Sequence, residues 1–159
     1  QTCALPIFIP MKIRKVLVTA ANPRQRTLPL QTVVDRHGEP KSALQIILEE
    51  AAGAGVEEFG VVVCPVDEVP YAEACGGLRA RVRFIVQEAP RGYGDAVRCG
   101  QPFIGHEPFL HLVGDHLQVS HGNQSCARQL LEVATNEKAS ISAVRATVSD
   151  RQVSQPVTG

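Results

Sequence analysis

Short apolar runs alternate with segments of helical periodicity along most of the chain. The runs are rich in β-branched residues and are bounded by Gly, Pro or charged residues, which is typical of buried strands. Between them, apolar residues recur every three or four positions, as on one face of an amphipathic helix. The pattern predicts strands at 14–21, 59–64, 81–87, 108–113 and 140–147, and helices at 41–53, 67–78, 95–99 and 123–136.

The first predicted helix has clear boundaries. Ser42 is a good N-cap because its hydroxyl accepts a hydrogen bond from an amide of the first turn. Gly53 and Gly55 mark the end of this helix. The polar segment 31–40 before it is predicted to continue the loop that follows the first strand.

The regular alternation of strands and helices predicts an α/β protein. We expect a three-layer, Rossmann-like fold with a mostly parallel sheet and helices on both faces. In such sheets ligands bind at the carboxyl ends of the strands. Three unusual loops follow strands at that edge, namely 21–30, 87–95 and 114–116. The sequence therefore predicts one composite ligand site.

Composition narrows the class of partner. Of the 159 residues, 44% are hydrophobic but only 4% are aromatic and none is Trp, so the core must be aliphatic. The 16 basic and 16 acidic residues cancel, and no long basic run occurs. These features argue against nucleic acid or an acidic membrane surface as a partner. No apolar segment approaches the roughly 18–20 residues that span a bilayer.

The five cysteines are scattered and form no C-x-x-C pair. We expect reduced thiols that pack as small hydrophobic residues, and hence a cytoplasmic protein. The sequence leaves the oligomeric state open, with a homo-oligomer among the alternatives.

The ends of the chain are expected to lie outside the folded domain. Residues 1–7 read as the translation of a common sequencing-adapter stretch, so 1–10 are interpreted as a non-native scar and Met11 as the natural start. The domain is predicted over 11–148. Residues 149–159 are interpreted as a tail at a truncation point.

Two arginines, Arg24 and Arg26, stand in the loop after the first strand. Guanidinium groups suit phosphate oxygens because they are always charged and donate two parallel hydrogen bonds. The alternative is an ordinary solvated loop.

The second loop carries Gln87, Gly92 and Gly94. A glutamine amide both donates and accepts hydrogen bonds, as the imide edge of a base requires, and glycines let the backbone approach a flat ligand. The alternative is an ordinary helix-entry turn.

Asp115 is the most specific single residue. It ends an apolar strand, where a carboxylate is typical of a Mg²⁺ ligand that faces nucleotide phosphates; the alternative is a turn or helix cap. The nearby His111, His116 and His121 suggest zinc, but alternation along the strand turns His116 away from the face that His111 and Asp115 share. We interpret these imidazoles as surface or packing groups.

Together these segments resemble the sugar-nucleotide pyrophosphorylases, most closely the bacterial UTP:glucose-1-phosphate uridylyltransferase type. The resemblance rests on 15–30, 43–63, 87–97 and 107–117 and covers nearly all of 11–147. It implies the N-terminal, nucleotide-binding part of a nucleotide-diphospho-sugar transferase fold, truncated before its later half.

The implied activity is transfer of a uridylyl group from UTP to a sugar 1-phosphate, glucose 1-phosphate in the first instance, with Mg²⁺ as cofactor. The resemblance implies catalytic roles for Arg26 and Lys41 and a metal-binding role for Asp115. The implied nucleotide-binding residues are Ala20, Ala21, Asn22, Arg24, Gln25, Arg26, Gln87, Gly92, Tyr93 and Asp95.

The sequence departs from the family at its phosphate loop. The family's loop is glycine-rich, whereas Asn22 and Arg24 stand here in place of the glycines, with Pro23 between them. Proline lacks an N–H donor and restricts the residue before it.

Two alternatives to uridylyl transfer stay open. One is thymidylyl or other nucleotidyl transfer by the same chemistry, because Gln87 alone does not distinguish uracil from thymine. The other is a degenerate domain that binds a nucleotide without catalysis. A dehydrogenase is disfavoured because no G-x-G-x-x-G follows the first strand.

Overall fold

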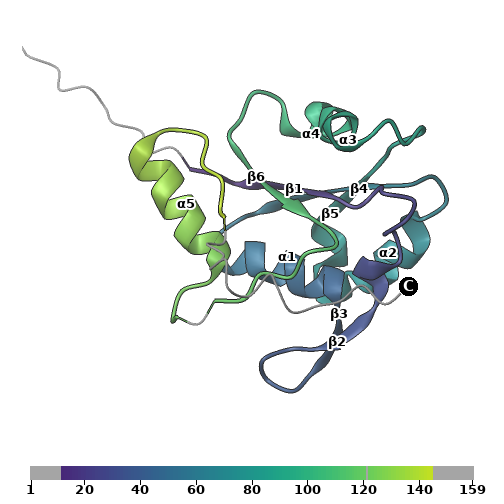
Figure 1. Ribbon diagram of the computed structural model, residues 1–159, viewed down its shortest axis with the longest axis horizontal. Coiled ribbons are helices and arrows are strands. Elements are labelled where there is room, and N and C mark those ends of the chain that lie inside the picture. The colour runs from purple at the N-terminus through teal and green to yellow at the C-terminus, as the bar shows by residue number, and fades with distance from the viewer. Residues whose placement is uncertain (1–11, 121, 145–159) are drawn as a thin grey trace, which may run out of the picture.

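The computed structural model describes residues 12–120 and 122–144. Its centre is a parallel sheet of β1 (Lys15–Thr19), β4 (Glu58–Val63), β5 (Val82–Val86) and β6 (Phe109–Val113), in the order β5-β4-β1-β6 (Figure 1). The inner strands β1 and β4 are nearly continuous apolar runs because both of their faces are covered. The sheet places the carboxyl ends of all four strands at one edge.

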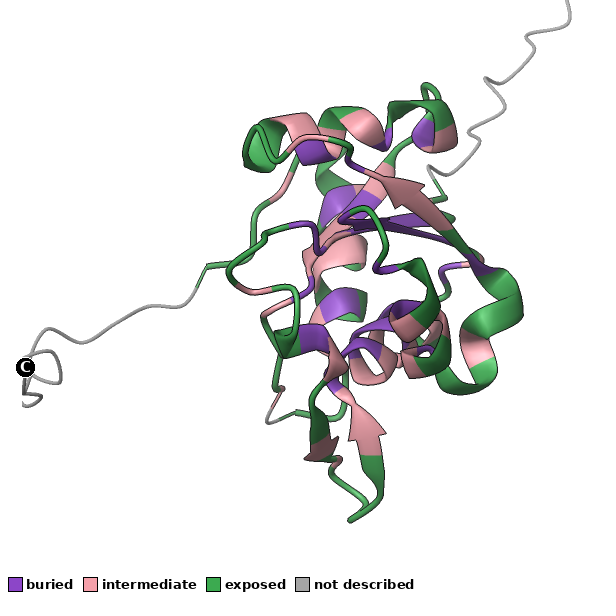
Figure 2. Cartoon of the chain, turned by 90° about the vertical axis from the view of Figure 1, so that its right-hand side faces the viewer, coloured by how far each residue is buried: buried purple, intermediate pink, exposed green. Residues whose placement is uncertain are grey.

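Helices cover both faces of this sheet. On one side lie α1 (Ala43–Gly53), α2 (Glu68–Ala74) and α5 (Cys126–Glu137), and on the other lie α3 (Tyr93–Cys99) and α4 (Gln101–Ile104) (Figure 1). Alternate residues of a strand point to opposite faces. Accordingly, Val16 and Val18 pack with α1, whereas Leu17 packs with Ala96 and Ile104. The buried residues concentrate along the strands and the inward helix faces (Figure 2). The predicted three-layer α/β fold is confirmed.

The first helix begins where the sequence predicts. Ser42 is its N-cap, and the Ser42 hydroxyl accepts a hydrogen bond from the Gln45 amide at 2.9 Å. The same hydroxyl donates to the Ala74 carbonyl at 2.5 Å, which ties α1 to α2. Gly55 follows the helix with φ +97°, a conformation that favours glycine.

The segment 31–40, predicted as loop, contains a hairpin instead. After a 3₁₀ turn, η1 (Leu28–Leu30), β2 (Thr32–Val34) pairs antiparallel with β3 (Pro40–Ser42). The Asp35 carboxylate closes the connection by accepting hydrogen bonds from the amides of His37 and Glu39 at 2.8 and 2.9 Å. The prediction was wrong here because three-residue strands are too short to show a period.

The remaining helices lie close to their predicted places. Cys75 ends α2 and a 3₁₀ helix, η2 (Gly76–Arg81), follows it, so the helix predicted over 67–78 is split. The helix predicted from 95 begins at Tyr93 and stops before Gly100. Among the described residues, no helix is long and apolar enough to cross a membrane.

The strand predicted over 140–147 is wrong for the part that the structure describes. Residues 140–144 are not in a strand, and apart from Ile141 they are exposed. Among the described residues, no strand pairs with the outer edge of β6, so residues 140–144 do not extend the sheet. Residues 145–147, like the predicted scar at 1–10 and tail at 149–159, lie outside the described residues.

Candidate functional site

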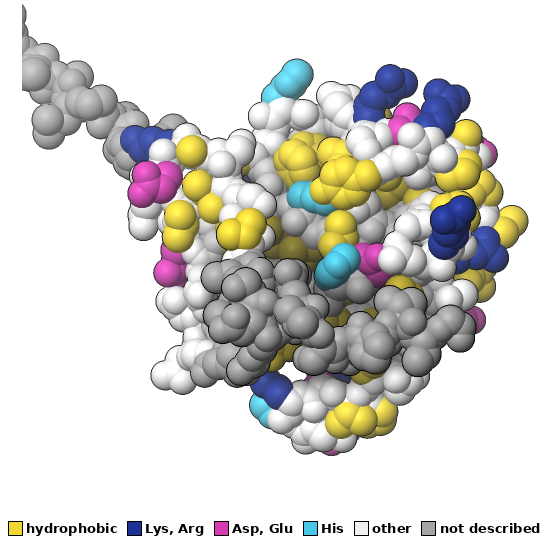
Figure 3. Space-filling model, in the orientation of Figure 1, with side chains coloured by type: hydrophobic (Ala, Val, Ile, Leu, Met, Phe, Trp, Pro, Cys, Tyr) yellow, Lys and Arg dark blue, Asp and Glu magenta, His cyan; other side chains and the backbone are white. Residues whose placement is uncertain are grey.

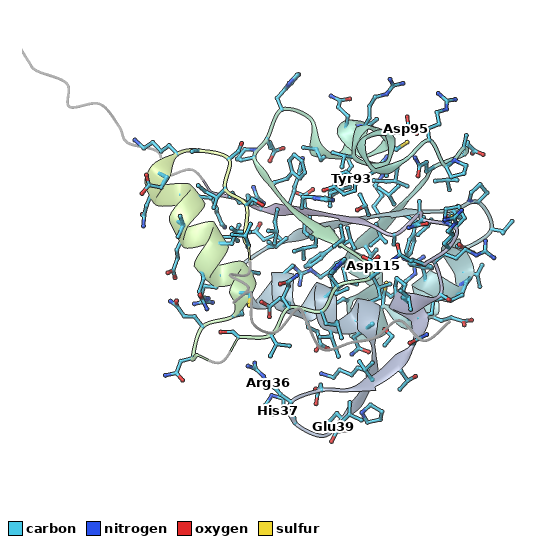
Figure 4. The ribbon with its side chains drawn as sticks, in the orientation of Figure 1. Arg36, His37, Glu39, Tyr93, Asp95 and Asp115 are labelled. Atoms are coloured by element: carbon cyan, nitrogen blue, oxygen red, sulfur yellow. The ribbon has the colours of Figure 1, made fainter. Side chains whose placement is uncertain are left out.

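A pocket of about 290 Å³ opens at the carboxyl edge of the sheet. The loops after β1, β5 and β6 form its walls, as the sequence predicts for a composite site. Its lining residues are Thr19, Ala20, Ala21, Asn22, Pro23, Gln25, Pro29, Gln87, Pro90, Gly92, Tyr93, Ala96, Val113 and Asp115. Figure 4 shows Tyr93 and Asp95 on the α3 side of the sheet and Asp115 at the end of β6. Of the predicted site residues, Arg24, Arg26, Lys41 and Asp95 do not line the pocket.

Gly114 allows two of these loops to approach closely. A Cβ atom at this position would lie 2.8 Å from the Ala20 Cβ and 3.2 Å from Pro29. Ala20 is itself fixed, since its amide donates to the Val62 carbonyl at 2.8 Å. Small residues at 20 and 114 therefore set the distance between Asp115 and the loop after β1. Sequence reasoning did not assign Gly114 a role, although its place directly before Asp115 is the available signal.

The loop after β1 is closed by its own hydrogen bonds. The Asn22 side-chain oxygen accepts from the Arg24 amide at 3.1 Å, and the Asn22 carbonyl accepts from the Gln25 amide at 3.0 Å. The Asn22 side-chain nitrogen also donates to the Gln25 side chain. These contacts engage two amides that a phosphate-binding loop would offer, and Pro23 has none. The Asn22 side chain and carbonyl thus close this turn.

Arg26 is held on the α2 side of the loop. Its guanidinium lies 3.4 Å from a carboxylate oxygen of Asp67, whose side chain is only 9% exposed. The Tyr71 hydroxyl donates to the Arg26 carbonyl at 2.8 Å and also lies 3.2 Å from the Ala20 carbonyl. Burial raises the pKa of Tyr71, which keeps this donor protonated. Side chain and backbone of Arg26 are both tied to the scaffold.

Lys41 belongs to the hairpin and not to the pocket. Its ammonium group lies 2.8 Å from a carboxylate oxygen of Glu49 and 3.0 Å from one of Asp35, and hydrogen bonds to these two carboxylates raise the pKa of Lys41. In Figure 4 the tip of the hairpin, marked by Arg36, His37 and Glu39, projects away from the sheet and from Asp115. The structure does not bring Lys41 to the predicted site.

Gln87 is the buried polar group of the second loop. Only 3% of the residue is exposed, and its amide nitrogen donates to the Asp95 carboxylate at 2.8 Å and to the Gly92 carbonyl at 3.4 Å. A carboxylate only accepts hydrogen bonds when ionised, so Asp95 fixes the orientation of the Gln87 amide. Gly92 turns the chain into α3 with φ +102°. Asp95 therefore orients Gln87 from outside the pocket.

Asp115 supplies the carboxylate of the pocket. Its side chain is 18% exposed, and one oxygen lies 2.7 Å from the His116 ring nitrogen. Within 12–120 and 122–144, no group of three or more His, Cys, Asp or Glu side chains is placed to hold a metal. Mg²⁺ is commonly held by one or two carboxylates together with substrate phosphates and water. The one carboxylate that lines the pocket, that of Asp115, fits that mode of binding.

His111 joins the walls of the pocket, a contact that the sequence did not predict. One ring nitrogen lies 3.1 Å from the Thr19 hydroxyl and the other 2.9 Å from the Tyr93 hydroxyl. Burial lowers the pKa of His111, which favours the neutral imidazole. The signal was hidden because the register between β1 and β6 is not readable from the sequence. His121 lies outside the described residues.

Curated proteins of known activity match this chain. A UTP–glucose-1-phosphate uridylyltransferase of Bacillus subtilis (strain 168), YngB, is 30% identical over 148 residues, which cover 77% of this chain and 49% of that protein. The corresponding protein of Streptococcus pyogenes is 30% identical over 160 residues, covering 84% and 53%. The chain thus spans about half the length of these curated relatives. No family model matches it.

Solved structures share the fold. A UDP-glucose pyrophosphorylase complexed with UDP-glucose superposes with a TM-score of 0.65 at 23% identity, over 80% of this chain and 55% of that one. A UTP-bound enzyme of the same type from Acinetobacter baumannii superposes with a TM-score of 0.62 at 21% identity, over 80% and 54%.

The chain thus has the α/β fold of the UDP-glucose pyrophosphorylases, with a pocket at the carboxyl edge of its sheet. Within that class, its similarity is to the bacterial UTP–glucose-1-phosphate uridylyltransferases. The resemblance expected from the sequence is confirmed.

Proposed function

We propose that the pocket binds the nucleotide of a uridylyl transfer, in which UTP and glucose 1-phosphate give UDP-glucose and pyrophosphate. The observation that carries the proposal is the convergence of Gln87, Gly92 and Asp115 on one pocket at the end of the sheet. The relatives that share this fold carry the name of the same activity.

Gln87 is proposed to read the base. With its amide nitrogen directed to Asp95, its carbonyl oxygen is the group suited to accept the imide N–H of uracil. The backbone at Gly92 supplies a close approach for a flat ring. Thymine presents the same imide edge, so Gln87 selects for the imide and not for the absence of a methyl group.

Asp115 is proposed to hold Mg²⁺ at the phosphates, where the ion would neutralise charge on the phosphate oxygens. In the transfer, an oxygen of the sugar phosphate bonds to the α-phosphorus, the bond from that phosphorus to the bridging oxygen breaks, and pyrophosphate leaves. Alignment of these groups by the pocket supplies most of what such a reaction requires.

A second candidate function is nucleotide binding without turnover. The specific observation in its favour is that both proposed catalytic cations have carboxylate partners outside the pocket, Asp67 for Arg26 and Asp35 for Lys41. The loop after β1 also favours this candidate, because its Arg24 and Gln25 amides already donate hydrogen bonds to Asn22.

We also propose a cytoplasmic location. The four cysteines that the structure describes, Cys64, Cys75, Cys99 and Cys126, are all free thiols, which suits a reducing compartment.

A thermal-shift titration with Mg²⁺ and UTP, TTP or ATP tests nucleotide binding. A ligand at about 100 times its dissociation constant adds roughly 2.7 kcal/mol of apparent stability. We expect a rise with UTP that Gln87→Ala and Asp115→Ala abolish. Glu88→Ala, an exposed neighbour outside the pocket, is the matched control and keeps the rise. No rise with any nucleotide contradicts the proposal.

Measurement of pyrophosphate release separates the two candidates. Release that requires both UTP and glucose 1-phosphate supports uridylyl transfer. UTP binding without release, under the same conditions, shows that these 159 residues bind the nucleotide but do not turn it over.

A further inference from the structure

We propose that His111 is a positioning residue of the nucleotide pocket: it fixes the ring of Tyr93 as the wall against which the bound nucleotide packs. This inference rests on the proposed function and adds to it two residues, His111 and Thr19, that the family resemblance does not assign.

The Tyr93 ring occupies an exposed position on the pocket. Tyr93 is the first residue of α3, lines the pocket beside Gln87 and Gly92, and is 60% exposed. An exposed aromatic side chain samples several rotamers unless a specific contact holds it. The described contact of its hydroxyl is the His111 ring nitrogen at 2.9 Å. The two rings also meet edge to face, with centroids 5.2 Å apart and planes at 72°.

His111 is suited to hold this ring because it is itself fixed. It lies on β6, which is paired with β1 along its whole length. Its second nitrogen lies 3.1 Å from the Thr19 hydroxyl, at the last residue of β1. A neutral imidazole donates at one nitrogen and accepts at the other, and each hydroxyl can take either role, so both hydrogen bonds are satisfied in either tautomer. Thr19, His111 and Tyr93 therefore form one chain from the sheet to the pocket wall.

The hydrogen-bonded series from Thr19 to Tyr93 gives the two sides of the pocket different roles in binding. The hydrogen-bonding groups of Gln87 suit some bases better than others. An aromatic wall, in contrast, contacts any base or ribose through its face or edge. Loss of the aromatic wall should weaken the binding of all nucleotides by a similar factor. Loss of Gln87 should change the preference among them.

The composition of the protein provides a direct optical probe. The chain has two tyrosines and no Trp, and Tyr71 is fully buried below the pocket. Nucleotide binding against Tyr93 should therefore change tyrosine emission, and Tyr93→Phe should remove that change. A parallel titration of N-acetyltyrosinamide corrects for absorption by the nucleotide.

The test compares UTP dissociation constants, measured by calorimetry on the 159-residue chain, for the wild type and a set of variants. Because a single hydrogen bond is worth about 0.5–1.5 kcal/mol, His111→Phe and Tyr93→Phe should each weaken UTP by roughly 2- to 12-fold. The double variant should lose no more than either single one, since both remove the same link. His111→Asn, which restores an acceptor for the Tyr93 hydroxyl, should recover most of the affinity.

The outcomes separate this inference from the proposed function. A wild type that binds no nucleotide overturns both. A wild type that binds UTP, with Tyr93→Phe and His111→Phe unchanged in affinity or additive in their losses, overturns only the present inference. Tyr93→Phe changes an exposed residue, so it decides the matter even if His111→Phe fails to fold.

Discussion

Asp67 is a buried carboxylate with a charged partner at only one of its two oxygens among the described residues. Arg26 pairs with one of its oxygens, and the other, Oδ2, has no hydrogen-bond partner among the described residues. A buried charge that loses its partner is costly, but Arg26 is 44% exposed and water screens part of the interaction. We predict that Arg26→Ala lowers the free energy of unfolding by about 1 kcal/mol, measured by urea denaturation.

Asp67→Asn in the Arg26→Ala background provides the control. The amide removes the uncompensated charge, so the double variant should regain stability relative to Arg26→Ala alone. If the second substitution lowers stability further, the role assigned to the ion pair is wrong.

Residue chemistry alone identified part of the pocket lining. Gln87, Gly92 and Asp115 line the pocket because each follows a strand, and strand ends meet at one edge. Arg26 and Lys41 do not line it, because carboxylates outside the pocket hold their side chains: Asp67 holds Arg26, and Asp35 holds Lys41. Residue type shows that a cation is available but not which anion will hold it.

At the scale of elements, packing of α4 on β4 depends on a glycine. A Cβ atom at Gly60, in the buried part of β4, would lie 2.7 Å from the ring of Phe103. Gly60→Ala should therefore destabilise the protein by about 1–3 kcal/mol.

Gly53→Ala is the matched substitution. Gly53 ends α1, has nothing within 4 Å of its Cβ position and needs no positive φ. It should stabilise by about 0.5–1 kcal/mol, because alanine suits a helix better than glycine. Thermal unfolding of both variants checks the pair, and equal effects of the two would contradict this packing.

The hairpin should respond to acid through Asp35. Hydrogen bonds from the Glu39 amide and from Lys41 lower the pKa of this carboxyl from 3.8 to about 2. The carboxylate therefore contributes stability above pH 3.8, and that contribution is lost as the pH falls toward 2.

Asp35→Asn keeps the acceptor oxygen but removes the charge, so the stability difference from the wild type should be full at pH 7 and should shrink between pH 4 and pH 2. Urea denaturation across this range measures the difference. A difference that stays constant over the whole range would show that Asp35 acts by shape and not by charge.

Elements were predictable where the pattern is long. The buried strands of the parallel sheet and the cap at Ser42 follow from local sequence. The hairpin β2–β3 did not, since its strands have three residues each and its turn depends on the Asp35 side chain. The alternation at 140–144 resembled a strand, yet a strand also needs a neighbour, which periodicity does not reveal.

At the scale of the whole molecule, the sheet order determines where ligands and partners meet the fold. β1 lies between β4 and β6, so its loop is central to the pocket. Beside β6 a groove of about 830 Å³ runs along α5 and residues 138–143. Figure 3 shows hydrophobic and histidine side chains gathered on this face of the molecule.

The sequence predicted the α/β fold class but not the order of the strands in the sheet. Alternating strands and helices implied three layers and a site at the carboxyl edge, and the pocket lies there. The order β5-β4-β1-β6 depends on which apolar runs pair, and all of them have similar composition. The contact between Thr19 and His111 followed from that pairing, so it was out of reach as well.

Nucleotide binding at this pocket is tested most directly by titrating the ¹⁵N-labelled 159-residue chain with UTP and Mg²⁺ and following its backbone amide resonances. We expect the shifted amides to cluster at 20–22, 87–95 and 114–116, while those of the hairpin around Lys41 stay in place. Shifts confined to other surfaces, or none at saturating nucleotide, would contradict the claim that this pocket is a uridine nucleotide site.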